Sequence, residues 1–426
     1  MPIRLRSLST SKNTIHFGSR IDGRALNAFM VALESTLSRG FTDICLDLRR
    51  VESAHSDAVL PLIWLVDERR ARGNTFRALL PTDETLGRLF VHTRWAKLLD
   101  PSQPEVDTVS AHHLAATRYT EHPEQQTAVK EAVDIVLRNI PSLRQDVLRA
   151  VEWSVNEITD NVLNHARAPN GGLVQVVTYR DNQIVKIVVS DGGRGIPAAM
   201  REAYPQLADD AAITKAMERG VSSPLDAGQG NGLAGSVALA RFSEGSFKIM
   251  SGWASLRLFQ DADGGWKTQK GRAPKGMKYP GTTAVLEMST EAQFDFAEAL
   301  GLDASTQPII DAVALHYTEG EDLVIRVRDE SLGVGTRHAG AELRRKTLNL
   351  LAADPSRRLV LDWEGVALVS SSFADEAIGK LFVELGFTTF MARVAHAGAE
   401  PVVASLLDKA VMQRVAQATA GAGDSS

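Results

Sequence analysis

The segment VEWSVNEITDNVLNH, residues 151–165, carries the strongest structural signal in this chain. Successive residues of an α-helix are rotated by about 100°, and this period predicts a helix over residues 146–166. Its apolar residues fall on one face, which we expect to be buried: Val151, Val155, Ile158 and Val162. Glu157, Asn161 and Asn164 lie in an arc beside that face. A carboxylate grouped with two carboxamides suits a hard cation or a polar ligand, whereas polar helix faces in general are solvated.

Two glycine clusters follow this helix. A strand predicted over residues 183–190 runs into Asp191-Gly192-Gly193-Arg194-Gly195-Ile196. Glycines allow the backbone to approach a flat ligand, and the carboxylate can accept a hydrogen bond from an exocyclic amine. The second cluster, Gly228-Gln229-Gly230-Asn231-Gly232-Leu233, precedes a predicted helix over residues 234–240, where exposed N–H groups suit a phosphate chain. Either cluster alone is also typical of an ordinary turn.

The order of these motifs resembles the ATP-binding domain of the GHKL superfamily, which includes gyrase, Hsp90, histidine kinases and MutL. The matching motifs are Glu157-x-x-x-Asn161-x-x-x-His165, Asp191-x-Gly193-x-Gly195, Gly228-x-Gly230-x-Gly232-Leu233 and Gly281-Thr282. The resemblance covers about residues 124–290 and implies a Bergerat-type α/β sandwich with ATP and Mg²⁺ as cofactors. A Walker A loop is absent, and no Gly-x-Gly-x-x-Gly fingerprint follows the first predicted strand.

The resemblance assigns roles residue by residue. Asn161 matches the Mg²⁺ ligand, Glu157 the general base that activates water in the hydrolysing members, and Asp191 the acceptor of the adenine amine. Residues 196–228 match a lid that we expect to be mobile. The other nucleotide-binding positions implied by the resemblance are Asn164, Gly193, Gly195, Ile196, Gly228, Gly230, Gly232, Leu233, Thr282 and Thr283. Lys215 and Arg219 are either phosphate contacts from the lid or solvated charges.

The two ends of the chain form a weak internal repeat of about 90 residues. Leu46-Asp47-Leu48 lies eight residues before Ser56, and Leu361-Asp362-Trp363 lies eight residues before Ser371. In both copies a helix follows the serine, and a predicted strand then begins with Thr-Phe, at residues 75–76 and 389–390. Chance similarity between two α/β domains is the alternative explanation.

Both ends resemble the STAS fold of anti-sigma-factor antagonists, which implies Ser56 and Ser371 as candidate phosphoacceptors. We favour Ser371, because Asp57 follows Ser56 and would repel a phosphate there. The alternative for both serines is helix capping, and Ser372 with Asp375 forms a capping-box pattern.

These observations predict an α/β and α+β multidomain fold, with a central GHKL (Bergerat) sandwich between two small STAS-like α/β domains. The expected parts are a STAS-like domain over residues 1–100, a linker over 101–122, a GHKL domain over 123–292, a second STAS-like domain over 293–416 and a disordered tail over 417–426. We interpret residues 260–281, which contain five Lys/Arg, as a flexible hairpin loop.

The composition limits the function classes. The 426 residues are 44% hydrophobic and 23% charged, which is typical of a globular protein. A net charge of -5 argues against nucleic acid as a partner. One cysteine excludes an internal disulfide. The N-terminus lacks a signal-peptide pattern and no long apolar run occurs, so we expect a cytoplasmic protein with no membrane partner.

The predicted function is a Mg·ATP-binding ATPase or protein serine kinase that acts as an intracellular, bacterial-type regulatory switch. STAS-type regulatory proteins are the expected partners, and a homodimer is compatible with this interpretation. The alternative is a non-catalytic ATP sensor or dimerisation clamp. No histidine-kinase phosphoacceptor pattern precedes the ATP-binding region, and an α/β domain follows it where gyrase and MutL have a lysine-donating domain.

Overall fold

The computed structural model describes residues 8–105, 113–220, 232–302, 312–330 and 333–423. These residues form two compact units. The first unit draws on residues 1–132, 150–179 and 184–305, and the second on residues 133–149, 180–183 and 306–426. Helices α5 (His122–Asn139) and α6 (Gln145–Asn161) each contribute residues to both units.

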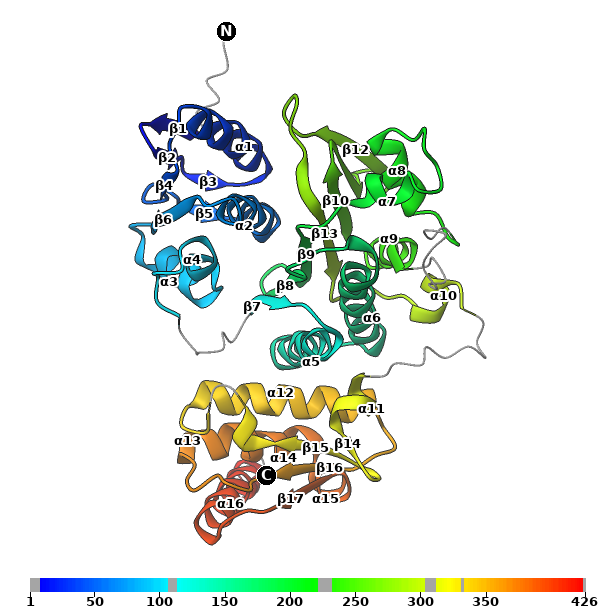
Figure 1. Ribbon diagram of the computed structural model, residues 1–426. Helices are drawn as coiled ribbons and strands as arrows, with labels where there is room; N and C mark the ends of the chain where they lie inside the picture. The colour runs from blue at the N-terminus through cyan, green and yellow to red at the C-terminus, as the bar shows by residue number, and fades with distance from the viewer. Residues whose placement is uncertain (1–7, 106–112, 221–231, 303–311, 331–332, 424–426) are drawn as a thin grey trace. The chain divides into compact units, whose positions relative to one another are not determined.

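The first unit contains a small N-terminal α/β domain (Figure 1). Its sheet has the order β1-β2-β4-β6; β1 is antiparallel to β2, and the other neighbours are parallel. Asp22 caps the first helix, and Asp83 caps the third by accepting the N–H of Leu86 at 2.8 Å. The elements are β1 (Leu8–Ser11), β2 (Thr14–Phe17), β3 (Arg20–Ile21), α1 (Gly23–Ser38), β4 (Asp43–Asp47), β5 (Ser53–Ala54), α2 (Ser56–Arg70), β6 (Thr75–Leu79), α3 (Glu84–His92) and α4 (Trp95–Leu99).

A seven-stranded antiparallel sheet forms the rest of the first unit. Its strand order is β12-β11-β10-β13-β9-β8-β7. The strands are β7 (His113–Tyr119), β8 (Gly172–Tyr179), β9 (Ile184–Asp191), β10 (Ser246–Gly252), β11 (Ala254–Gln260), β12 (Trp266–Arg272) and β13 (Tyr279–Ser289). The accompanying helices are α6 (Gln145–Asn161), a π-helical turn η1 (Val162–Ala166), α7 (Ile196–Met200), α8 (Asp209–Ala216), α9 (Gly232–Phe242) and α10 (Phe296–Leu300).

Two segments of this sheet differ from the sequence expectation. Strand β7 lies inside the expected linker over residues 101–122, where it pairs with β8. The expected flexible loop over residues 260–281 contains β12, which pairs with β11 along its whole length. They are the two edge strands of the sheet and contain many polar residues, so their alternation of apolar and polar residues is weak.

One face of the seven-stranded sheet packs against the N-terminal domain. Side chains alternate between the two faces of a strand, so Val188 lies on the same face of β9 as Lys186. Val188, Met250 and Val285 belong to the same buried core as the N-terminal sheet and α2. The N-terminal domain, residues 8–100, therefore shares one apolar core with the strands of the predicted ATP-binding domain.

An ion cluster lies in this shared interface, with Lys186 buried and its partners partly buried. Asp57, on the first turn of α2, accepts hydrogen bonds from Lys186 Nζ at 3.1 Å and Lys248 Nζ at 2.8 Å. Lys186 also pairs with Glu287 at 3.3 Å. Burial alone raises the pKa of Asp57, but the two lysines more than offset it, and the pKa falls below its ordinary value.

The second unit has a sheet with the same plan as the N-terminal one. In its order β14-β15-β16-β17, the first pair is antiparallel and the others are parallel. This match supports the internal repeat. The strands are β14 (Thr318–Glu319), β15 (Asp322–Arg326), β16 (Leu359–Asp362) and β17 (Val394–Ala397). The helical elements are α11 (Ala312–Tyr317), η2 (Val327–Asp329), α12 (Arg337–Ala353), α13 (Ser371–Ala374), η3 (Asp375–Gly379), α14 (Lys380–Leu385), α15 (Phe387–Arg393) and α16 (Pro401–Gly423).

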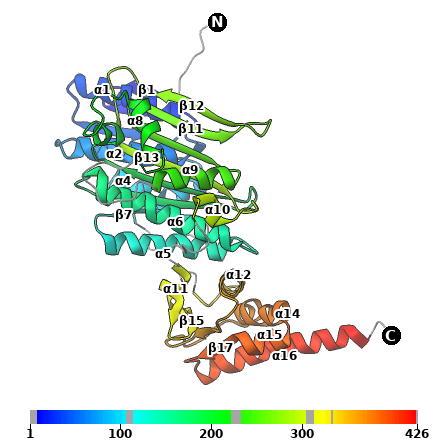
Figure 2. The same ribbon diagram turned by 90° about the vertical axis from the view of Figure 1, so that its right-hand side faces the viewer.

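Two expectations for this unit differ from the structure. Thr389-Phe390 lies in helix α15 rather than at the start of a strand, because Phe390 is buried against Phe382 with ring centroids 5.4 Å apart. Helix α16 continues to Gly423 through most of the expected disordered tail, as Figure 2 shows. Alanine, the strongest helix former, recurs along that stretch. In the described part of the chain, no helix is both long and apolar enough to cross a membrane.

Candidate functional site

Asp191 ends strand β9 and is the centre of the candidate site. Only 3% of its surface is exposed. Its carboxylate accepts the N–H of Gly193 at 2.8 Å and the N–H of Thr282 at 3.2 Å. Burial raises the pKa of Asp191 to about 7, against the lowering effect of the two N–H groups. A carboxylate held in this way is oriented before any ligand arrives.

Glycines allow the backbone to pack closely around Asp191. A Cβ at Gly281 would lie 2.3 Å from Asp191 Oδ1, and one at Gly193 would lie 2.2 Å from the carbonyl oxygen of Ala166. Gly195 has a φ of +77°, which favours glycine. The sequence motif is therefore explained by contacts that no larger residue allows.

Ser251, which the motifs do not include, completes this corner. Its Oγ accepts the N–H of Ile196 at 2.9 Å and donates to the carbonyl oxygen of Gly281 at 2.8 Å. Its Oγ also lies 3.1 Å from Thr282 Oγ1. A lone serine at a strand end carries no distinctive signal in the sequence, so only the tertiary structure reveals it.

The two threonines of the predicted site lie on opposite faces of the sheet. Thr282 donates its N–H to Asp191, whereas Thr283 Oγ1 lies 2.7 Å from Ser190 Oγ. Thr283 lies on the same face of β13 as Val285, two residues further on, and Val285 belongs to the core shared with the N-terminal domain. Thr283 is therefore separated from the Asp191 carboxylate by the sheet.

Glu157 and Asn161 on α6 meet the start of α9. A Cβ at Gly232 would lie 2.7 Å from Glu157 Oε2 and 3.2 Å from Asn161 Nδ2. Asn161 Nδ2 is buried and has no hydrogen-bond partner among the described residues. Burial raises the pKa of Glu157, with a further contribution from Asp160. Leu233 is half-buried beside Gly232, while Gly228 and Gly230 lie outside the described residues.

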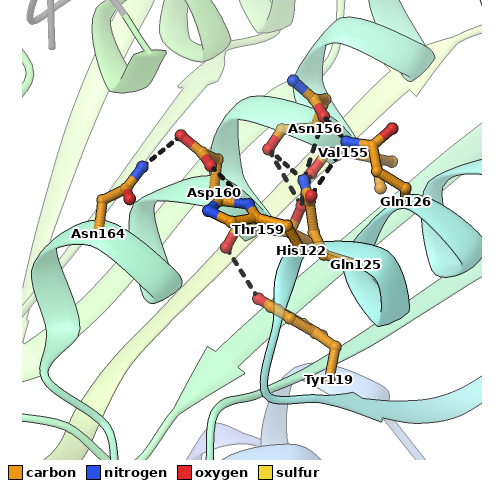
Figure 3. A network of polar contacts seen from close by, with 9 residues as sticks. All are labelled: Tyr119, His122, Gln125, Gln126, Val155, Asn156, Thr159, Asp160 and Asn164. Carbon is orange, nitrogen blue, oxygen red and sulfur yellow. Dashed lines mark hydrogen bonds and ion pairs between the residues drawn. The ribbon is translucent and has the colours of Figure 1, made fainter.

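The neighbouring polar residues of α6 have structural partners, as Figure 3 shows. Gln125 Nε2 donates to Thr159 Oγ1 at 2.9 Å and to Asn156 Oδ1 at 3.1 Å, which joins α5 to α6. Asn164 is exposed and donates to Asp160 Oδ2 at 2.6 Å. The expected arc of Glu157, Asn161 and Asn164 is thus divided, because the π-helical turn after Asn161 changes the helical phase before Asn164.

The expected lid contains two ordered helices. Asp209, at the start of α8, accepts the N–H of Trp253 at 2.6 Å and pairs with Arg201. Lys215 pairs with Glu218 at 2.6 Å, and Arg219 donates to the carbonyl oxygen of Ala299 at 3.4 Å. Residues 196–220 are therefore tied to the sheet and to each other, and residues 221–231 lie outside the described part.

The two candidate phosphoacceptors differ in accessibility. Ser371 is exposed, whereas Ser56 is 4% exposed, and its Oγ has no hydrogen-bond partner among the described residues. Neither serine caps a helix: Ser370 does, by accepting the N–H of Phe373 at 3.0 Å. The expected pair of Ser372 and Asp375 does not form, because both carboxylate oxygens of Asp375 accept from Arg414 at 2.7 Å.

Asp191 should give the stability of the protein a measurable pH dependence. Its pKa rises from 3.8 to about 7 on folding, so the folded state holds a proton that the unfolded state releases. This stabilisation is present at low pH and lost as the pH rises through about 7. We expect the free energy of unfolding to fall by up to about 1.4 kcal/mol per pH unit between about pH 5 and 7. Urea denaturation of wild type and Asp191→Asn at several pH values measures this slope, and parallel curves would contradict the assignment.

Comparison with known proteins identifies one domain. A family model described as a STAS-like domain of unknown function (DUF4325) matches residues 339–404. These residues run from α12 into α16 and include Ser371. The chain thus has a STAS-like domain in its C-terminal part, within a mixed α/β multidomain fold. No curated protein matches the chain.

Proposed function

We propose that the first unit binds Mg·ATP at the corner formed by Asp191, Gly193, Thr282, Glu157 and Asn161. The observation that carries this proposal is the buried Asp191 carboxylate, oriented by two backbone N–H groups. A buried acceptor with this orientation suits the exocyclic amine of adenine. The close approaches at Gly193 and Gly281 leave backbone, rather than side chains, beside the base.

The phosphates would lie toward Glu157, Asn161 and the start of α9. Helix N-termini favour anions, and Asn161 has an amide without a partner among the described residues. Mg²⁺ is commonly held by one or two protein groups together with substrate phosphates, so a single carboxamide from Asn161 fits this cation. The bound cation would neutralise the developing phosphate charge.

We further propose that Glu157 acts as the general base and that the protein is an ATPase or serine kinase. The raised pKa of Glu157 brings it closer to the pH at which a base is effective. The product would act through the STAS-like domains as an intracellular regulatory switch, with STAS-type regulatory proteins as partners. In the kinase form of this proposal the exposed Ser371 is the acceptor in preference to the buried Ser56.

Calorimetric titration with a non-hydrolysable ATP analogue tests the site. Asp191→Asn should lower affinity by about 5- to 150-fold, because losing a buried acceptor costs about 1–3 kcal/mol. Asn161→Ala should remove the Mg²⁺-dependent part of binding. The matched control is Asp100→Asn: Asp100 is also buried and accepts backbone N–H groups, from Ala78 at 2.9 Å and Ser102 at 3.0 Å. Equal affinities for Asp191→Asn and Asp100→Asn would refute the proposed site.

A further inference from the structure

We propose that Trp64, contributed by the N-terminal domain, is a positioning residue for the turn at Asp191–Gly195 and sets the preference of the site for adenine. This inference rests on the proposed function, because it concerns the ligand of the same site. It makes the N-terminal domain a part of the nucleotide site rather than a separate partner of it.

The indole ring of Trp64 lies directly against the turn. Trp64 is on α2 and is 3% exposed. A Cβ at Gly192 would lie 2.8 Å from Cε3 of Trp64 and 3.3 Å from Cδ2 and Cζ3. Gly192 stands between Asp191 and Gly193, whose N–H orients the Asp191 carboxylate. The ring therefore occupies the space next to the peptide that holds the proposed adenine acceptor.

The ring is itself held in place from other sides. The guanidinium of Arg118, on β7, lies 4.6 Å from the ring centroid and pairs with Asp67 Oδ2 at 2.6 Å. Asp67 is on the same helix as Trp64. The pairing of Asp57 with Lys186 and Lys248 holds the first turn of that helix to β9 and β10. Contacts from its own helix α2 and from the sheet therefore both fix the position of Trp64.

A glycine-rich turn depends on such a contact. Gly192, Gly193 and Gly195 have no side chains that could restrict their backbone, so the conformation of the turn depends on its hydrogen bonds and on what packs against it. Removing the ring leaves a cavity behind the turn. The carboxylate of Asp191 would then be less well oriented, and its discrimination between an amine and a carbonyl at the purine 6-position would fall.

The test uses the full chain and compares non-hydrolysable analogues of ATP and of inosine triphosphate, which carries a carbonyl in place of the amine. We expect Trp64→Ala to weaken ATP binding about tenfold, equivalent to about 1.4 kcal/mol. Binding of the inosine analogue should weaken less, so that the ratio of the two affinities shrinks. Trp64→Phe, which keeps part of the ring, should have an intermediate ratio, and it also serves if Trp64→Ala does not fold.

The matched control is Trp95→Ala. Trp95 is another buried tryptophan of the N-terminal domain, and its Nε1 donates to Gln175 Oε1 on β8 at 3.0 Å, away from the turn. It should leave the affinity ratio unchanged. A ratio unaltered by both Trp64 variants, or altered equally by Trp95→Ala, overturns the inference. Asp191→Asn distinguishes a failure of the proposed function from a failure of this inference. If Asp191→Asn leaves the affinity for the ATP analogue unchanged, the proposed function itself is wrong. If Asp191→Asn weakens ATP binding as expected but the Trp64 variants leave the affinity ratio unaltered, only the role of Trp64 is refuted.

Discussion

Glu157→Gln is expected to lower ATP turnover by about 10²- to 10⁴-fold, the usual contribution of a general base. Glutamine has nearly the same size as glutamate but cannot accept the proton of the attacking water or serine hydroxyl. Because the N–H groups of Gly193 and Thr282, and not Glu157, orient the Asp191 carboxylate, the affinity for the ATP analogue should stay close to that of the wild type. Measuring ADP release together with calorimetric affinity separates these two effects.

Asp160→Asn is the matched control for this experiment. Asp160 lies on the same helix and carries the same charge, but its carboxylate is engaged by Asn164 at 2.6 Å. It should change turnover far less than Glu157→Gln.

Mass spectrometry of the wild type after incubation with Mg·ATP identifies the reaction: a phosphate on Ser371 supports a kinase, and ADP without phosphoprotein supports an ATPase. Binding with neither product would contradict catalysis and favour an ATP sensor.

Asp57→Ala is expected to destabilise the first unit by about 3–5 kcal/mol, as is typical when one partner of a buried ion pair is removed. The variant would leave Lys186 and Lys248 without their shared carboxylate, and among the described residues Glu287 would be the remaining counter-charge, 3.3 Å from Lys186. Chemical denaturation measures the loss. Hydrogen exchange of β9 and β10 should rise in the same variant, because α2 would no longer be held against them.

Glu68→Ala provides the comparison for Asp57. Glu68 is on the same helix, but its partner Arg72 is 60% exposed, so we expect a loss below about 1 kcal/mol. The lowered pKa of Asp57 adds a pH test, since the stabilisation from an ionised carboxylate is present near neutral pH and is lost as the pH falls through its folded pKa. Equal stabilities of Asp57→Ala and Glu68→Ala would show that the cluster contributes little.

The interface around Asp57 and Trp64 bears on the proposed regulatory switch. Ser56 is buried beside Asp57, so a kinase could reach it only after α2 leaves the sheet. The same movement would withdraw Trp64 from Gly192. If nucleotide binding and docking of α2 are coupled in this way, each must favour the other by the same factor. The proposed switch would then operate within the first unit.

Local patterns in the sequence were sufficient for much of the proposed site. The helical period predicted α6, and the position of Asp191 at the end of a strand predicted the glycine turn, because both depend on neighbouring residues. The strand–helix alternation likewise predicted both terminal α/β domains. The Thr-Phe pair of the first copy begins strand β6, but the corresponding pair of the second copy, residues 389–390, lies in helix α15. The matched STAS-like family supports the C-terminal domain.

Contacts between distant segments decided the rest. Which of Thr282 and Thr283 lies beside Asp191 depends on which sheet face meets the N-terminal domain, and the packing of Trp64 on Gly192 joins residues 128 positions apart. Strand β7 has too little alternation to be predicted alone and exists because β8 supplies its hydrogen bonds. Sequence periodicity indicates which residues of one element share a face, but it does not identify the element that packs against that face. That choice follows from packing the whole chain.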